Sequence, residues 1–292
     1  MNFFASLKTK EKLMKGVFVS CAFFSIFALG VITVFLFANG LPFMVEIGVG
    51  NFLFGTVWHP TGDVPQYGIL PMIVGSLYVT ALSVVLGVTL GLFTAVCLFN
   101  FVPKWLATPI RHMINLLAGI PSVIFGMIGL NVIVPFLRDY VSPNGVGYGM
   151  LAAALVLSVM ILPTIVSVSL DSLYAVPREY FEGSLALGAT VPQATFTVVL
   201  PAAKSGILAA VVLAVGRAIG ETMAVIMVLG NSPEMPTGLF QSVRTLTANI
   251  ALGAMEMPEE AVSALIATGV VLFVFTLLIN VSFSLLKRER DK

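Results

Sequence analysis

Residues 16–38 read GVFVSCAFFSIFALGVITVFLFA, a run of 23 residues without a charged side chain. About 20 consecutive apolar residues are enough for a helix to cross the hydrocarbon core of a bilayer. The run is longer than the roughly 7–15 apolar residues of a cleaved signal peptide, and five more apolar runs follow it. We therefore predict that residues 16–38 form a transmembrane helix that is retained in the mature protein.

The rest of the chain has the same character. Hydrophobic residues make up 58% of its 292 residues and charged residues only 10%, with a mean hydropathy of +1.04. Because a soluble globular protein carries roughly 25% charged residues, a soluble enzyme, a disordered chain and a nucleic-acid-binding protein do not fit. The apolar runs are continuous rather than alternating, which favours helices over a β-barrel. The sequence predicts an all-α membrane protein with six transmembrane helices. The five further spans are expected at Leu77–Phe99, Met113–Leu137, Gly149–Leu170, Ser205–Gly230 and Ala261–Leu286.

Six spans place both ends of the chain on one side of the membrane, and the basic residues indicate which side. Cytoplasmic loops carry an excess of Lys and Arg. Of the 15 basic residues, Arg217 lies within a span, Arg138 and Arg244 lie on one face, and the remaining twelve lie on the other. The twelve are Lys8, Lys10, Lys12, Lys15, Lys104, Arg111, Arg178, Lys204, Lys287, Arg288, Arg290 and Lys292. We therefore predict that both termini are cytoplasmic, with a cytoplasmic N-terminal segment (residues 1–15) before a membrane domain (residues 16–292).

Two charged residues interrupt the fifth run. Arg217 is the thirteenth of the 26 residues in Ser205–Gly230, so we expect it near the bilayer centre, where insertion scales assign a cost of roughly 2.5–3.5 kcal/mol. Glu221 follows four residues later, on the same face of a continuous helix, where the two charges would pair. One interpretation is a translocation site for an anion, because the guanidinium is permanently charged and matches phosphate or carboxylate geometry. The other is a buried ion pair that only holds helices together.

The segment between the fourth and fifth runs, residues 171–204, is too long for a simple helix connection of about 2–8 residues. Pro177 suits the first turn of a helix and Gly188 its C-terminal end, and Pro192 opens a second short helix that ends near Pro201. We expect a helix–turn–helix at the membrane surface. Its apolar side chains would be costly in water without a partner, which favours a docking surface. These side chains are Tyr180, Phe181, Leu185 and Leu187.

No segment carries the residues of a catalytic, metal or cofactor site. The phosphate-cradling pattern G-x-x-x-x-G-K-[ST] is absent, and the two histidines, His59 and His112, have no companion motif for a metal. Cys21 and Cys97 lie inside apolar runs, where a disulfide framework is not expected. If the protein moves a solute uphill, the energy must come from a partner or from an ion gradient.

The helix–turn–helix segment carries a specific resemblance. Permease subunits of ABC importers share the pattern E-A-A-x3-G-x9-I-x-L-P. The sequence matches this spacing at Glu182, Gly183, Ser184, Gly188, Val198, Leu200 and Pro201. Gly and Ser replace the two alanines, and Val replaces the isoleucine. The resemblance implies that Phe181, Glu182, Leu185 and Gly188 couple this chain to a cytoplasmic ATPase, which an ion-driven carrier would not need.

Three other segments are similar to the phosphate-specific permeases of this family, the PstC permeases. They are residues 118–126 (AGIPSVIFG), 216–225 (GRAIGETMAV) and 244–251 (RTLTANIA). The resemblance implies a type I ABC importer permease fold and a multi-pass protein of the bacterial inner membrane. It further implies a permease subunit of an inorganic phosphate importer, without enzymatic activity, with Arg217 and Glu221 on the path of the anion. A permease for another oxyanion, such as molybdate or tungstate, is the alternative.

The same resemblance implies the partners of the chain. They would be a second permease similar to PstA, ATPase subunits similar to PstB and an external phosphate-binding protein similar to PstS, assembled in the lipid bilayer. ATP would be used by the ATPase subunits, so no cofactor is expected in this chain.

Overall fold

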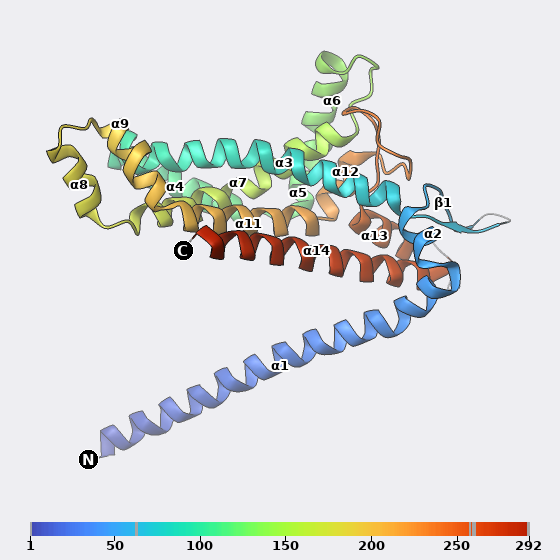
Figure 1. The fold of residues 1–292 in the computed structure, drawn as a ribbon, viewed down its shortest axis with the longest axis horizontal. Coiled ribbons are helices and arrows are strands. Elements are labelled where there is room, and N and C mark those ends of the chain that lie inside the picture. The colour runs from blue at the N-terminus through green and yellow to red at the C-terminus, as the bar shows by residue number, and fades with distance from the viewer. Residues whose placement is uncertain (1, 62–63, 257, 259–260, 291–292) are drawn as a thin grey trace.

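A computed structural model describes residues 2–61, 64–256, 258 and 261–290 of the chain. Helices make up almost all of it (Figure 1). Within these residues the only strands, β1 (Trp58–His59) and β2 (Gln66–Tyr67), form a short antiparallel ribbon. The α-helices are α1 (Asn2–Ile47), α2 (Val49–Phe54), α3 (Leu70–Val96), α4 (Lys104–Ala118), α5 (Ser122–Ile128), α6 (Val134–Phe136), α7 (Met150–Tyr174), α8 (Arg178–Ala186), α9 (Val191–Ala194), α10 (Leu200–Ala202), α11 (Lys204–Gly220), α12 (Met223–Leu229), α13 (Leu246–Glu256) and α14 (Val262–Arg290). The π-helical segments are η1 (Cys97–Phe101), η2 (Gly129–Ile133), η3 (Leu137–Val141) and η4 (Thr195–Val199).

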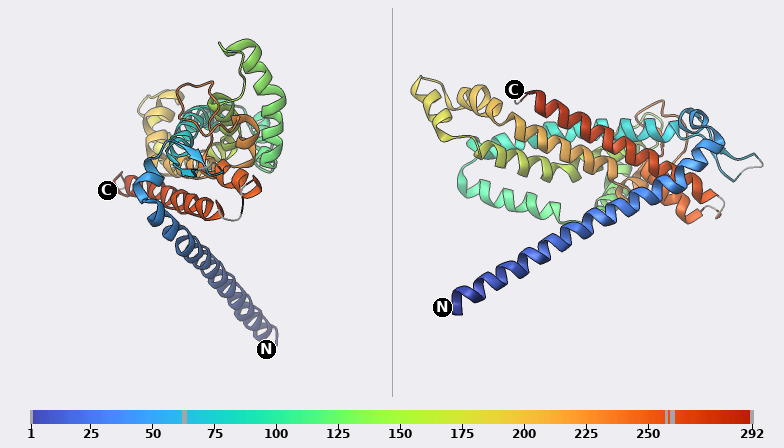
Figure 2. Two further views of the ribbon diagram at one scale, coloured as in Figure 1. Left: turned by 90° about the vertical axis from the view of Figure 1, so that its right-hand side faces the viewer. Right: turned by 60° about the horizontal axis from the view of Figure 1, so that its bottom comes forward.

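The body of the molecule is a bundle in which α3, α7, α11 and α14 lie side by side (Figures 1 and 2). Within the described residues, five stretches of helix are long and apolar enough to cross a membrane. A sixth is added if the bent pair Val191–Ala202 and Lys204–Gly220, which meet at 68°, is one span. The five are Leu13–Ile47, Leu70–Phe101, Ser122–Val141, Met150–Tyr174 and Val262–Ser282. The predicted all-α membrane fold is confirmed.

The two ends of the chain lie toward the same end of the molecule. The beginning of α1 and the end of α14 both point to the end that carries α8 and α9 (Figure 1). A chain that crosses the membrane an even number of times has both of its ends on the same side. The cytoplasmic location of that end stays a prediction, and Met1 and Lys292 lie outside the described residues.

Helix α1 contains the first apolar run and extends well beyond it. It leaves the bundle at an angle (Figure 2) and contacts α14 through its C-terminal half. A Cβ atom on Gly40 would lie 2.7 Å from Cγ2 of Val270, so the two helices approach closely at that glycine. The large apolar side chains of residues 13–35 are exposed in the chain alone, Phe23 and Phe24 among them. That part of α1 therefore needs lipid or another subunit to cover it.

The third span differs from the prediction. We expected one helix over Met113–Leu137, but α4 ends at Ala118 and a new helix begins at Ser122 after a break at residues 119–121. The preceding helix ends before Pro121, because a proline ring clashes with a preceding helical turn and supplies no N–H. Pro121 itself is extended and directly precedes the new helix. The apolar stretch that follows, Ser122–Val141, is the candidate span, and α4 is a separate helix that packs on α7.

Helices α3 and α7 pack closely because glycines of α3 face isoleucines of α7. A Cβ atom on Gly87 would lie 2.7 Å from Cδ1 of Ile161, and one on Gly91 would lie 2.7 Å from Cγ2 of Ile165. Glycine removes the side chain that would otherwise hold the two backbones apart. This contact fixes α7 in the centre of the bundle, between α3, α4 and α11.

Candidate functional site

The fifth span is broken at Glu221, one of the two charged residues that we expected on its path. The prediction of one continuous helix over Ser205–Gly230 is wrong: α11 ends at Gly220, and α12 begins at Met223. Glu221 is extended, with φ −72° and ψ 129°. Gly220 has a low helix propensity and Thr222 is β-branched, so the two residues beside Glu221 weaken the helix where it ends.

Side chains satisfy the backbone groups that this break exposes. The carboxylate of Glu221 accepts a hydrogen bond from the backbone N–H of Ala224 at 3.1 Å, in the first turn of α12. The hydroxyl of Thr247 donates to the carbonyl of Glu221 at 3.1 Å. A negative charge at the start of a helix is stabilised by the helix dipole. Glu221 therefore serves as a cap for α12.

Arg217 lies four residues before Glu221, in the last turn of α11, and is half-buried. The expected Arg217–Glu221 ion pair is not formed, and no other hydrogen bond or ion pair joins Arg217 to the described residues. The backbone break separates the two side chains, and the carboxylate of Glu221 is engaged with α12 instead. The hypothesis of a buried ion pair that only holds helices together is therefore not supported.

The face of α11 that carries Arg217 is not covered by this chain. Ala210, Ala214 and Ala218 pack into the bundle and are buried. Leu213 and Gly220, one turn on either side of Arg217, are exposed. Arg217 thus stands at the edge of an open helix face, where its guanidinium is available to something outside this chain.

The third segment that carried the resemblance, residues 244–251, lies against the break. It forms a buried turn and the start of α13, and Thr247 is only 7% exposed. The side chain of Arg244 donates to the carbonyl of Asn231 at 2.9 Å and to the side-chain oxygen of Asn249 at 3.3 Å. The backbone N–H of Leu246 donates to the hydroxyl of Ser76 on α3. The turn is therefore fixed to both α3 and the end of α12.

The remaining segment, residues 118–126, approaches the same place. A Cβ atom on Gly126 of α5 would lie 2.7 Å from Sδ of Met227 and 3.0 Å from Cα of Ala224. Helices α5 and α12 are thus in close backbone contact at the residue that Glu221 caps. Three segments that are far apart in sequence, 118–126, 216–225 and 244–251, meet around the break.

At the other end of the bundle, the predicted helix–turn–helix is confirmed. Helix α8 follows Pro177, and Gly188 has φ +90°, a left-handed conformation that only glycine adopts without strain. Thr190 and Gln193 then form a capping box at the start of α9. Short helical segments continue to Ala202, and α11 follows.

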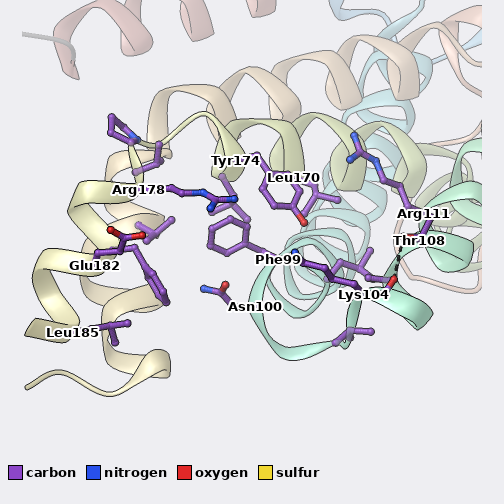
Figure 3. Close-up of a pocket in the computed structure, with 18 of the residues that line it drawn as sticks. Phe99, Asn100, Lys104, Thr108, Arg111, Leu170, Tyr174, Arg178, Glu182 and Leu185 are labelled. Atoms are coloured by element: carbon purple, nitrogen blue, oxygen red, sulfur yellow. Dashed lines mark hydrogen bonds between the residues drawn. The ribbon is translucent and has the colours of Figure 1, made fainter.

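The apolar side chains of α8 face two ways. Leu187 is 92% exposed and Tyr180 is 55% exposed, as expected for a docking surface. Phe181 and Leu185 are half-buried and, with Glu182, line a cavity of about 850 Å³ between α8, α4, η1 and the end of α7 (Figure 3). The basic residues that line this cavity are Lys104, Arg111, His112 and Arg178. Figure 3 shows the side chain of Arg178 extending into it.

The sequence analysis identified α8, Arg217 and the segment 244–251, but not the contact between that segment and the break. Thr247 donates to the Glu221 carbonyl at the break, and Ser76 and Arg244 hold the turn that carries Thr247 in place. Thr247 lies 26 residues from Glu221 along the chain. The only signal in the sequence was the polar run around Thr247, which has too little apolar length to resemble a span.

A protein-family comparison matches residues 87–292 to the binding-protein-dependent transport system inner membrane components. The chain is 41% identical over 266 residues to the probable ABC transporter permease protein YqgH of Bacillus subtilis, covering 90% of this chain and 86% of that relative. It is 37% identical to the phosphate transport system permease protein PstC of Mesorhizobium japonicum, with coverages of 86% and 82%. The PstC protein of Haemophilus influenzae is 36% identical, with coverages of 79% and 78%.

Solved structures show the same fold at low sequence identity. An inward-facing MetNI methionine ABC transporter matches with a TM-score of 0.60 and 22% identity, over 74% of this chain and 93% of that one. A bacterial ABC transporter involved in the import of alginate matches with a TM-score of 0.60 and 16% identity, over 92% of this chain and 96% of that one. The chain therefore has the fold of type I ABC importer permeases.

Proposed function

The chain belongs to the family of binding-protein-dependent transport system inner membrane components, and from this premise we propose that it is a permease subunit of an ATP-driven importer of inorganic phosphate. Members of this family are multi-pass inner membrane proteins that work with an ATPase and a substrate-binding protein. The observation that identifies phosphate as the substrate in this proposal is the similarity to phosphate permeases over more than three quarters of the chain.

The partners follow the same similarity. We infer a second permease similar to PstA, ATPase subunits similar to PstB and an external binding protein similar to PstS. ATP is used by the ATPase subunits, and this chain holds no cofactor and performs no catalytic step. Two exposed surfaces support the need for partners: residues 13–35 of α1 and the open face of α11 around Arg217.

The end of the bundle that carries α8 faces the cytoplasm in this proposal. The excess of basic residues at that end supports the orientation. Tyr180 and Leu187 offer apolar contacts to the ATPase, and the left-handed turn at Gly188 fixes the angle between α8 and α9. Phe181, Leu185 and Glu182 connect this surface to the cavity behind α8. The helix–turn–helix is the element through which ATP-driven movement enters the chain.

The anion passes along the open face of α11, between this permease and the second one. Phosphate carries one to two negative charges at neutral pH and needs compensation at membrane depth. Arg217 supplies a charge that cannot be lost by deprotonation. Because the carboxylate of Glu221 is hydrogen-bonded to α12 rather than to Arg217, it does not neutralise the guanidinium directly. Glu221 instead holds the break at which α11 and α12 can change their relative angle.

A substrate competition experiment tests this function. The complete complex is reconstituted in proteoliposomes with its binding protein, and ATP-dependent uptake of radioactive phosphate is measured with excess molybdate, tungstate or sulfate. We expect phosphate uptake that requires ATP and is unaffected by the other oxyanions. Uptake of molybdate or tungstate in preference to phosphate would establish the alternative substrate instead.

A further inference from the structure

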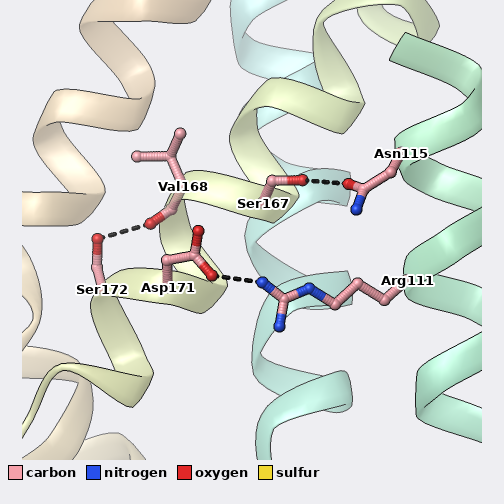
Figure 4. Close-up of polar contacts among 6 residues, drawn as sticks. All are labelled: Arg111, Asn115, Ser167, Val168, Asp171 and Ser172. Carbon is pink, nitrogen blue, oxygen red and sulfur yellow. Dashed lines mark hydrogen bonds and ion pairs between the residues drawn. The ribbon is translucent and has the colours of Figure 1, made fainter. Parts of the chain in front are cut away.

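Helix α4 and the end of α7 are joined by two polar contacts that line up along the helices (Figure 4). A side-chain nitrogen of Arg111 lies 2.5 Å from a carboxylate oxygen of Asp171. One turn later on α4 and one turn earlier on α7, the hydroxyl of Ser167 donates to the side-chain oxygen of Asn115 at 2.9 Å. Among the described residues, the Arg111–Asp171 contact is the only ion pair between two different helices. The two contacts fix the register of α4 on α7.

The carboxylate of this pair lies in the last turn of α7, directly before the helix–turn–helix begins. Asp171 is three residues before the end of α7, and only residues 175–177 separate that end from α8. The next residue, Ser172, is in close contact with α11, because its hydroxyl oxygen occupies the place that a Cβ atom on Gly206 would need. The last turn of α7 is therefore held between α4 on one side and α11 on the other. A displacement of α8 reaches Asp171 through one rigid turn of helix.

Helix α4 leads from this pair toward the break at Glu221. After residues 119–121 the chain continues as α5, whose Gly126 lies against Ala224 of α12. Ala224 is the residue whose N–H binds the Glu221 carboxylate. A contiguous set of packed elements thus runs from α8 through α4 and α5 to the residues beside Arg217. Movement is transmitted between distant sites through such contiguous packed elements.

The exposure of the pair indicates that its purpose is not to stabilise the fold. The side chains of Arg111 and Asp171 are 39% and 64% exposed. Exposed ion pairs contribute little to stability, because water and salt screen them. Their removal should therefore leave the complex assembled. Removal of the pair would instead free α4 to shift relative to the last turn of α7, which leads into α8.

We propose that Arg111 and Asp171 form a positioning tie that transmits the movement of α8 to α4 and α5, and through them to the break at Glu221. The proposal rests on the proposed function, in which an ATPase moves α8. Without the tie, α7 and α11 follow the ATPase while α4 and α5 do not. ATP hydrolysis then continues with less transport.

Charge reversal tests the tie. Arg111→Glu, Asp171→Arg and the doubly reversed variant are purified as complete complexes, and phosphate uptake and ATP hydrolysis are measured on the same proteoliposomes. Coupling energies between distant sites typically correspond to about 5- to 150-fold. We expect each single variant to transport about tenfold less phosphate per ATP, with normal complex yield, and the doubly reversed variant to recover to within about twofold.

The matched control is the pair Arg138 and Asp139, which is 2.8 Å apart and similarly exposed but joins neighbouring residues of η3. Arg138→Glu should leave the phosphate-to-ATP ratio unchanged. A wild-type ratio in both single variants of the tie, or no recovery in the doubly reversed variant at normal complex yield, would overturn the proposal.

A second measurement does not depend on the substrate. In a variant without native cysteines, spin labels are placed at two exposed positions, Met127 on α5 and Lys204 at the start of α11. We expect ATP to change the distance between the labels in the otherwise wild-type complex and in the doubly reversed variant, but not in the single variants. An unchanged response in the single variants contradicts the tie. Failure of the proposed function would instead appear as absent phosphate uptake by the wild-type complex.

Discussion

Replacement of Glu221 by glutamine distinguishes a helix cap from an ion pair. In the structure, the carboxylate accepts the N–H of Ala224 and has no ion pair among the described residues. Glutamine retains an acceptor oxygen at nearly the same place, so the hydrogen bond can persist without its charge. Alanine removes the acceptor and leaves a buried N–H without a partner.

The expected magnitudes follow from this contact. Hydrogen bonds to charged groups contribute about 1.5–3 kcal/mol and neutral ones about 0.5–1.5 kcal/mol, so Glu221→Gln should cost about 1 kcal/mol locally. Glu221→Ala should cost about 1–3 kcal/mol, the penalty of an unsatisfied buried donor. If Glu221 were instead the partner of a buried Arg217, removal of its charge would cost about 3–5 kcal/mol.

Hydrogen–deuterium exchange of the peptide that covers residues 221–229 measures these costs directly, because exchange reports local opening of helix ends. We expect exchange to accelerate about fivefold in Glu221→Gln and about 5- to 150-fold in Glu221→Ala. Glu234→Gln, which changes an exposed carboxylate beyond the end of α12, should leave this peptide unchanged.

The same experiment in an Arg217→Leu background separates the two explanations. Substitutions at sites that do not interact change stability additively, within about 0.5 kcal/mol. Glu221→Gln should therefore accelerate exchange of residues 221–229 by the same factor with and without Arg217. Disappearance of the effect in that background would refute the cap and restore the ion pair.

Three further predictions concern packing, coupling and topology. Gly126→Val should lower the melting temperature of the complex by overpacking α5 against α12, at a cost of about 1–3 kcal/mol; an unchanged melting temperature would contradict the close contact. Gly188→Val should release the ATPase from the membrane complex or uncouple ATP hydrolysis from transport, because valine is strained at φ +90°. The control is Gly183→Ala in α8, where a Cβ atom meets nothing within 4 Å; it should leave co-purification of the ATPase and phosphate uptake unchanged. In a variant without native cysteines, an impermeant thiol reagent added to intact cells should label a cysteine at position 234 and not one at position 104; labelling of position 104 would reverse the orientation.

Most of the fold was predictable because membrane spans are determined by local composition. All six expected spans overlap helices, and only the third and the fifth are interrupted. The turn at Gly188 was predicted from the left-handed conformation that glycine allows. The break at residues 119–121 was indicated in the sequence by Gly119 and Pro121. We nevertheless predicted one span there, because hydropathy averaged over an apolar window does not separate two adjacent helices. Local patterns thus located the spans more reliably than their interruptions.

The arrangement around Glu221 was not predictable from the fifth run alone. A helix continued through Glu221 would have placed both charges on one face. The break is held by Thr247, from a segment that only the folded chain brings near, and by the preference of the carboxylate for the start of α12. The sequence therefore identified Arg217 as a candidate, but the ion pair that we expected with Glu221 is not formed among the described residues.

Phosphate uptake by the Arg217→Gln complex tests the central claim most directly. A charge at membrane depth costs roughly 2.5–3.5 kcal/mol, and in this account Arg217 offsets a cost of that size for the anion. Its removal should then slow uptake about 70- to 400-fold, since each 1.36 kcal/mol is a factor of ten. The account predicts that loss with a normal yield of complex, and partial activity in Arg217→Lys, which keeps the charge without the planar fork. Normal phosphate uptake by Arg217→Gln, or by the variant with leucine at both 217 and 221, would contradict it.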